Sequence, residues 1–222
     1  MSNQFLGYIF NNPLLLKQAL THPSLCARDD DSLSSYERLE FLGDSALNLI
    51  IAEFLMNKFP YEDEGKLAKR RAALVSGEML TKIAMEINLG EQIRMTEAEE
   101  RGGGRKNSNN LENVLEAIIG AIYLDSGLEN LKAVIYNLWE KLIDEMVEVP
   151  IDAKSKLQEI LQKNGYDLPK YELIESVGPK HMLNFRIRLK VPGFEEVIGQ
   201  GKSKQQAEKE AASLLLLQME QI

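Results

Sequence analysis

The chain has 222 residues, of which 44% are hydrophobic and 27% are charged, and its formal net charge is −8. This composition is typical of a soluble globular protein and excludes disordered and fibrous classes. A single cysteine excludes an intramolecular disulfide framework, and because the first residues, MSNQFLGYIF, lack the features of a signal peptide, we expect a cytoplasmic protein without a membrane partner.

Charge is distributed unevenly along the chain. Residues 1–151 carry 15 Lys and Arg against 24 Asp and Glu, a balance of −9, whereas residues 152–222 carry 11 against 10, a balance of +1. Segments of such different charge indicate domains with different partners. Pro150 marks the expected boundary, and we predict two domains, over 1–149 and 152–222.

The elements predicted in the first segment are all helical, because apolar residues recur there at helical spacing and no stretch alternates as a strand would. Ser34 and Glu37 have the spacing of a capping box at the start of the longest helix. Residues 101–110, RGGGRKNSNN, indicate a flexible basic loop. The predicted helices cover 13–20, 34–58, 65–75, 76–87, 111–127 and 130–146. We therefore predict an all-α domain.

The period changes beyond Pro150. A helix over 153–163 precedes a segment in which Leu183, Phe185, Ile187, Leu189 and Val191 alternate with polar residues, as in a strand with one solvated face. Strand-like segments also cover 171–177 and 195–201, and a helix closes the chain. The predicted order is α-β-β-β-α, an antiparallel sheet with both helices on one face.

Three acidic residues lie in the longest helix, within the stretch ERLEFLGDS. Glu37, Glu40 and Asp44 are spaced three and four apart, so they project on one side. Like charges at this spacing repel, and Asp is a poor residue for a helix interior. A cation would explain them, and Mg²⁺ or Mn²⁺ suits carboxylates without neighbouring Cys or His. Glu37 alone has the alternative of closing the capping box.

A second helix carries a similar pattern. Asn113 and Glu116 are three apart in an apolar segment, and Gly120 would allow another helix to approach closely. If the two polar faces oppose each other, four side chains gather around one or two ions: Glu40, Asp44, Asn113 and Glu116. Metal-assisted attack of water on a phosphodiester is the reaction that such a cluster serves. The alternative is that Asn113 and Glu116 face solvent.

The stretch ERLEFLGDSAL, residues 37–47, resembles the signature of the ribonuclease III family, endonucleases that cut double-stranded RNA. The similarity continues in LTHPS, EGKLAKRRAALVS and LEAIIGAIYLDSG. The second segment resembles a double-stranded RNA-binding domain through KSKLQEILQ, LPKYE, GPKH and GQGKSKQQAEKEAA. Together these motifs cover nearly the whole chain in the family's order.

The resemblance implies a Mg²⁺ site, with Mn²⁺ as a substitute and no small-molecule cofactor. It implies that Asp44 and Glu116 are catalytic, that Glu40 is a further ligand, and that Glu37 and Glu64 lie in the RNA cleft. It also implies a homodimer in which Phe41 contacts the partner subunit, although a core position is the alternative for that ring. The implied reaction processes rRNA, mRNA or tRNA precursors and leaves 5′-phosphates, 3′-hydroxyls and two-nucleotide 3′ overhangs.

Asn113 departs from the family pattern, which has aspartate at this position. Asparagine offers a carbonyl oxygen without charge, so we predict weaker Mg²⁺ binding rather than loss of activity. The rival hypothesis is a double-stranded RNA-binding regulator whose metal site Asn113 has disabled. Retention of the acids at positions 37, 40, 44, 64 and 116 favours the enzyme.

The second domain is expected to read the shape of an RNA duplex through phosphates and 2′-hydroxyls. Cations at a helix N-terminus are unfavourable unless a phosphate docks there, and Lys202 and Lys204 occupy such a place. A solvated charge pair is the alternative. The predicted contacts are Gln158 and Glu159 on the first helix, Lys180 and His181 in the GPKH loop, and Lys202 and Lys204.

Overall fold

The computed structural model describes residues 4–26, 34–146, 148–149, 153–177 and 183–219. The chain divides into two compact units, Met1–Pro150 and Ile151–Ile222. Each unit has its own apolar core. None of the helices in the described ranges is both long and apolar enough to cross a bilayer.

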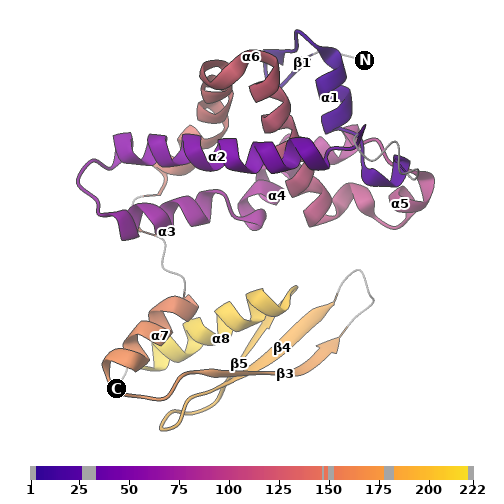
Figure 1. The fold of residues 1–222 in the computed structure, drawn as a ribbon. Coiled ribbons are helices and arrows are strands. Elements are labelled where there is room, and N and C mark those ends of the chain that lie inside the picture. Colours follow the sequence, from indigo (N-terminus) through magenta and orange to yellow (C-terminus); the bar gives the residue numbers. More distant parts are fainter. Residues whose placement is uncertain (1–3, 27–33, 147, 150–152, 178–182, 220–222) are drawn as a thin grey trace. The chain divides into compact units, whose positions relative to one another are not determined.

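The first unit is helical, as predicted, with the addition of a small antiparallel hairpin of β1 (Gln4–Phe5) and β2 (Tyr8–Ile9) near its start. Short 3₁₀ helices connect the α-helices, and those that the described ranges contain in full are η1 (Pro23–Leu25), η3 (Leu89–Gln92) and η4 (Gly104–Lys106). The α-helices are α1 (Pro13–Ala19), α2 (Glu37–Lys58), α3 (Glu64–Leu74), α4 (Gly77–Glu86), α5 (Glu97–Arg101) and α6 (Ser108–Asp144) (Figure 1).

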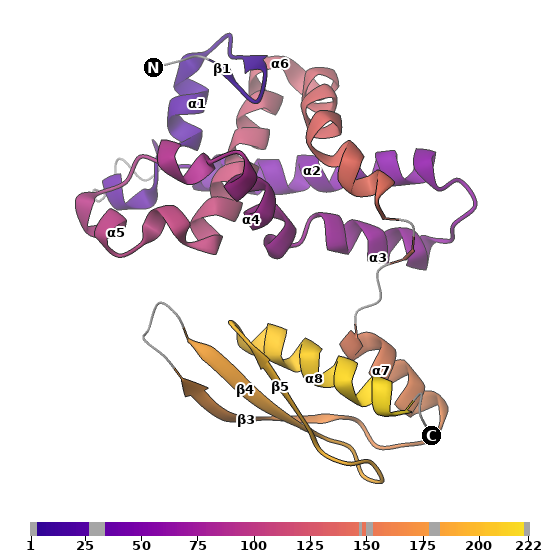
Figure 2. The same ribbon diagram turned by 180° about the vertical axis from the view of Figure 1, so that it is seen from behind.

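Helices α2 and α6 pack against each other at the centre of this unit, and α3 runs alongside α2 (Figures 1 and 2). The first half of α6 is buried on nearly every side, which explains its continuous apolar sequence. Gly127 interrupts α6 with φ 80° and ψ −176°, so the break predicted there is confirmed. Beyond the kink, Trp139 is buried and its indole nitrogen donates to the carbonyl of Leu74 over 3.0 Å.

Two local predictions were wrong. The first residue of α2 follows Tyr36, which forms no side-chain cap, and the hydroxyl of Ser35 donates to Glu37 Oε2 at 3.0 Å. The Ser34–Glu37 capping box is therefore absent, because the helix begins two residues later than the spacing suggested. The predicted loop over 101–110 instead contains η4 and the first turn of α6.

The guanidinium of Arg105 explains why this segment is ordered. It donates to the carbonyls of Gly90 and Ile93 and forms an ion pair with Glu100 at 2.7 Å. Asn107 then caps α6 by accepting from the backbone nitrogens of two following residues. A run of Gly, Arg and Asn therefore forms specific turns, because its polar groups find partners in the helical body.

The second unit has the predicted α-β-β-β-α order. Its strands pair antiparallel in the order β3-β4-β5, and both helices lie on one face of the sheet (Figure 1). Gly199 lets α8 approach the sheet, since a Cβ there would lie 2.1 Å from the carbonyl oxygen of Ala207. The elements are α7 (Ala153–Lys163), β3 (Lys170–Val177), β4 (Asn184–Lys190), β5 (Val197–Gly201) and α8 (Lys204–Met219).

Candidate active site

A cavity of about 560 Å³ lies where the start of α2 faces the start of α6. Four of its lining residues are those predicted to share a metal ion, and Glu37 also lines it. The two helices therefore oppose their polar faces in the way that the spacing of the acids suggested. The lining residues are Tyr36, Glu37, Glu40, Phe41, Asp44, Glu112, Asn113 and Glu116.

Glu116 is the most deeply placed acid of the cavity. Its side chain is only 8% exposed, and it has no hydrogen bond or ion pair with any described residue. Burial, followed by repulsion from Asp44, Glu112 and Glu40, raises the pKa of Glu116 to about 8. A buried carboxylate without a partner is costly, and a cation in the cavity would relieve that cost.

The two acids on α2 differ in their surroundings. Asp44 is exposed, and the side-chain amide of Asn48 donates to its Oδ1 over 2.8 Å, which orients the carboxylate. Glu40 is partly buried, and this burial, together with repulsion from neighbouring acids, raises its pKa. Asp44 is therefore the accessible and positioned acid, and Glu40 the more confined one.

Asn113 is engaged within the wall of the cavity. Its side chain lies near the hydroxyl of Tyr36, a residue that is 3% exposed and also lines the cavity. Burial is the main cause that raises the pKa of Tyr36 to about 12, so this hydroxyl stays protonated. Asn113 thus lies where α6 packs against the start of α2.

Glu112 also lines the cavity, although the sequence pattern did not single it out. It lies four residues before Glu116, so both occupy the same side of α6, and burial followed by repulsion from Asp44 raises its pKa. Its carboxylate rests against Gly77, where an added Cβ would lie 2.4 Å from Oε2. The four-residue spacing from Glu116 was the available signal, but spacing alone does not distinguish a site from a solvated face.

These side chains have the chemistry for Mg²⁺ without forming a closed cage. Within the described ranges, no three His, Cys, Asp or Glu side chains lie close enough together to hold an ion as they stand. Mg²⁺ commonly keeps several waters and takes only one or two carboxylates directly, so an open cavity of oxygen ligands containing the unpartnered Glu116 fits this ion.

Glu64 does not line this cavity. It is the first residue of α3, is exposed, and follows Asp63, whose side chain caps the helix by accepting from the nitrogen of Lys66. The family resemblance implies that Glu64 and Glu37 lie in an RNA cleft, and this stays a prediction. The structure brings Glu37 to the acidic cavity and leaves Glu64 elsewhere on the surface of the same unit.

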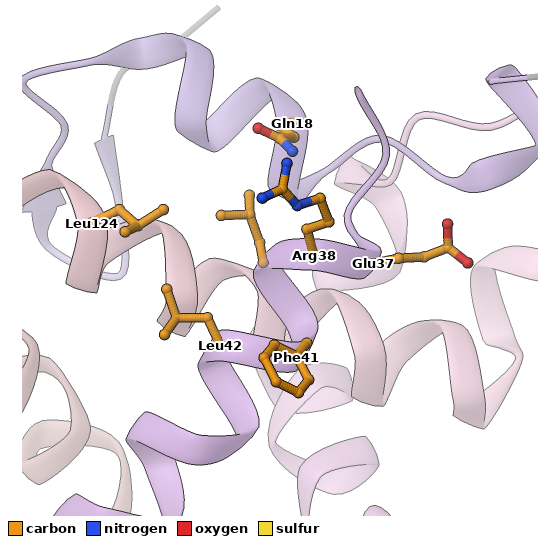
Figure 3. Close-up of a pocket in the computed structure, with 7 residues that line it drawn as sticks. Gln18, Glu37, Arg38, Phe41, Leu42 and Leu124 are labelled. Carbon is orange, nitrogen blue, oxygen red and sulfur yellow. The ribbon is translucent and has the colours of Figure 1, made fainter. Parts of the chain in front are cut away.

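An apolar groove of about 620 Å³ lies beside the acidic cavity, and Figure 3 shows Phe41, Leu42 and Leu124 bordering it. Phe41 is 79% exposed, which excludes the alternative that it is a core residue. Leu49 and Met56 are also exposed farther along α2. The outer side of this helix therefore carries an apolar stripe, defined by Phe41, Leu49 and Met56.

The second unit presents its predicted RNA contacts on its surface, as far as they are described. Gln158 and Glu159 are exposed on α7. Lys202 and Lys204 are exposed at the start of α8, where the hydroxyl of Ser203 accepts from the nitrogen of Gln206 over 3.1 Å. Lys180 and His181 lie outside the described residues.

Comparisons with known proteins agree with this two-part organisation. The family described as "Ribonuclease-III-like" matches residues 12–143, and the "Double-stranded RNA binding motif" matches residues 153–219. The chain is 47% identical over 214 residues to Ribonuclease 3 of Ehrlichia ruminantium (strain Welgevonden), covering 96% of this chain and 94% of that protein. It is 46% identical over 215 residues to Ribonuclease 3 of Wolbachia pipientis wMel, covering 96% and 93%.

A solved structure of the nuclease domain of ribonuclease III from Campylobacter jejuni is similar to the first unit. It shares 45% sequence identity and a TM-score of 0.58, covering 63% of this chain and 94% of that one. A second structure of that domain shares 42% identity with the same TM-score. The chain belongs to the ribonuclease III family.

Proposed function

We propose that this protein is a Mg²⁺-dependent endoribonuclease that works as a homodimer and cuts double-stranded segments of rRNA, mRNA or tRNA precursors. The observation that carries the metal dependence is Glu116, a buried acid without a partner, in a cavity that Asp44 and Glu40 also line. Membership of the ribonuclease III family and the double-stranded RNA-binding motif support the substrate.

The acids of the cavity would have different roles in metal binding and catalysis. Asp44, oriented by Asn48, and Glu116, held deep in the wall, are the residues that we assign to the metal and to the chemistry, with Glu40 as a further ligand. The chemistry that Mg²⁺ supplies when bound is neutralisation of phosphate charge and activation of a water. The products expected are a 5′-phosphate, a 3′-hydroxyl and a two-nucleotide 3′ overhang.

The apolar stripe on α2 supports the homodimer. Exposed apolar patches of this kind mark interaction surfaces in soluble proteins. One of the Campylobacter jejuni structures describes flexibility in a region of that nuclease domain involved in dimer formation. Phe41 lines both the apolar groove and the acidic cavity. A second protomer that covers the apolar stripe would therefore lie next to the acidic cavity.

We assign duplex recognition to the second unit. The exposed amide and carboxylate of Gln158 and Glu159 suit 2′-hydroxyls, and Lys202 and Lys204 suit phosphates that dock at the start of α8. Lys180 and His181 remain predicted contacts. Recognition by shape would leave the choice of transcript to the structure of the RNA rather than to its sequence.

A cleavage assay tests the proposal. A long RNA duplex is incubated with the native protein, with Glu116→Gln and with Glu140→Gln, which removes the same charge from an exposed position farther along α6. We expect short products from the native protein and Glu140→Gln only in the presence of Mg²⁺, and retarded but intact RNA with Glu116→Gln. Retarded, uncut RNA with all three proteins would instead support the RNA-binding regulator.

A further inference from the structure

The lining of the acidic cavity is unbalanced in charge. It contains five carboxylates, from Glu37, Glu40, Asp44, Glu112 and Glu116, and no Lys, Arg or His. Glu116 is more than nine-tenths buried and has no partner in the described part of the chain. The burial of Glu116 without a partner points to a cation between α2 and α6, independently of the number of acids.

Two neighbouring residues of α6 could bring a further oxygen ligand to that cation. Asn113 lines the cavity beside Tyr36 and carries no charge. Glu112 lies on the side of α6 that bears Glu116, since the two are four residues apart. Only one of these neighbours therefore has a charged group available to the cavity.

The packing of α4 gives Glu112 its place. Its carboxylate lies against Gly77, the first residue of α4, where a side chain would collide with it. The carboxylate is partly buried there and forms no hydrogen bond or ion pair with any described residue. A partly buried acid without a partner at the edge of the cavity is in the same situation as Glu116.

We propose that Glu112, rather than Asn113, provides with Glu116 the second α6 carboxylate that binds the divalent cation. This inference rests on the proposed function, because it concerns the ligands of the same site. Asn113 is then an uncharged residue of the cavity wall, next to Glu112 along α6. Although position 113 is uncharged, α6 then still provides two carboxylates to the site, those of Glu112 and Glu116.

Metal affinity measured without RNA tests the assignment. Mn²⁺ and Mg²⁺ are titrated into the full chain by calorimetry, and Mn²⁺ binding is also followed by electron paramagnetic resonance. We expect Glu112→Gln to weaken metal binding roughly tenfold or more, because the loss of even a residue that only supports a ligand has an effect of this size. Glu140→Gln, the same change of charge on the same helix, should bind like the native protein, and thermal melting verifies that both variants are folded.

A double-mutant cycle with Asn113→Asp separates a ligand from a merely structural Glu112. In the native background Asn113→Asp should change the affinity at most severalfold, whereas in the Glu112→Gln background it should restore most of the lost affinity. Equal factors in both backgrounds, native affinity in Glu112→Gln, or no Mn²⁺ binding by the native protein at millimolar concentrations would each overturn the inference.

The two proposals fail in different ways. If the native protein cuts RNA but Glu112→Gln binds Mn²⁺ as tightly as the native protein, the assignment of Glu112 is wrong and the proposed function stands. If the native protein binds Mn²⁺ in a manner that depends on Glu112 but leaves duplex RNA intact, the proposed function is wrong and the ligand assignment stands.

Discussion

Gly43 of α2 and Gly120 of α6 face each other at the point where the two helices cross. A Cβ on Gly43 would lie 1.7 Å from the carbonyl oxygen of Glu116, and a Cβ on Gly120 would lie 2.2 Å from that of Leu39. The backbones therefore touch without intervening side chains. This contact brings the α2 acid next to Gly43, Asp44, to the same cavity as Glu116.

Alanine at either glycine should destabilise the first unit. Because backbone atoms cannot move aside as a flexible side chain does, we expect Gly43→Ala or Gly120→Ala to cost about 1–3 kcal/mol of unfolding free energy, and to slow cleavage by the protein that remains folded. Urea denaturation and cleavage rates measure both effects. Gly65→Ala is the control, since its Cβ would meet nothing closer than 3.4 Å in α3. Equal effects at all three positions would contradict this account.

Glu116 should make the metal-free protein less stable as the pH rises. Its pKa in the folded state, about 8, exceeds the ordinary value of 4.5, so the folded state holds a proton that the unfolded state releases. The stabilisation is complete below about pH 4.5 and is lost as the pH rises towards 8.

Melting temperatures in a chelator at pH 5 and pH 8 test this sign. From pH 5 to pH 8, the unfolding free energy of Glu116→Gln relative to that of the native protein should rise by at least about 1 kcal/mol. That amount corresponds to less than one unit of pKa shift. Added Mg²⁺ should remove the gain, since the ion binds the ionised carboxylate. A difference between the two proteins that is the same at both pH values would rule out the titration of Glu116 as its cause.

Phe41 and Tyr61 form a matched pair for testing the dimer. Both rings are exposed, at 79% and 99%, but only Phe41 belongs to the apolar stripe. Phe41→Ala should weaken association at least tenfold, because burying a phenyl ring contributes about 1.5–3 kcal/mol, and Tyr61→Ala should leave it unchanged. Sedimentation over a range of concentrations gives the dissociation constants. An unchanged dissociation constant in Phe41→Ala would show that the dimer interface does not include Phe41.

Lys202 and Lys204 should control the salt dependence of duplex binding. Each phosphate contact contributes close to one unit to the slope of the logarithm of affinity against the logarithm of salt concentration. Replacing both residues with Ala should therefore reduce this slope by about 2 for a long duplex, while Lys163→Ala, at the far end of α7, should not change it. Lysines that are merely solvated would leave the slope intact.

Much of the fold could be predicted because its signals are local. Apolar residues at helical spacing predicted α1, α3 and α4, and the alternation that buries Ile187 and Leu189 predicted β4. The start of α2 could not be predicted in this way. Ser34 has the residue type of a cap, but the backbone nitrogen of Tyr36 donates to the carbonyl of Thr21, and this distant contact coincides with the later start of the helix.

The site was predictable in part for a similar reason. Glu40 and Asp44 attract notice because acids are unfavourable inside an apolar helix, and Glu116 because its neighbours are apolar. Glu112 has no such local signal. Its place in the cavity depends on Gly77 of α4, a residue 35 positions earlier in the chain, whose missing side chain leaves room for the carboxylate.

The adjacency of residues 112 and 113 on α6 has an evolutionary consequence. If Glu112 binds the cation as proposed, a chain with acids at both positions has a complete site, and an aspartate at position 113 could be lost once a glutamate is present at position 112. Among relatives, an acidic residue should therefore be present at position 112 or at position 113. Chains with an acid at neither position should be rare among those that cut RNA. Lineages can drift between the two arrangements while the glycine crossing of α2 and α6 stays unchanged.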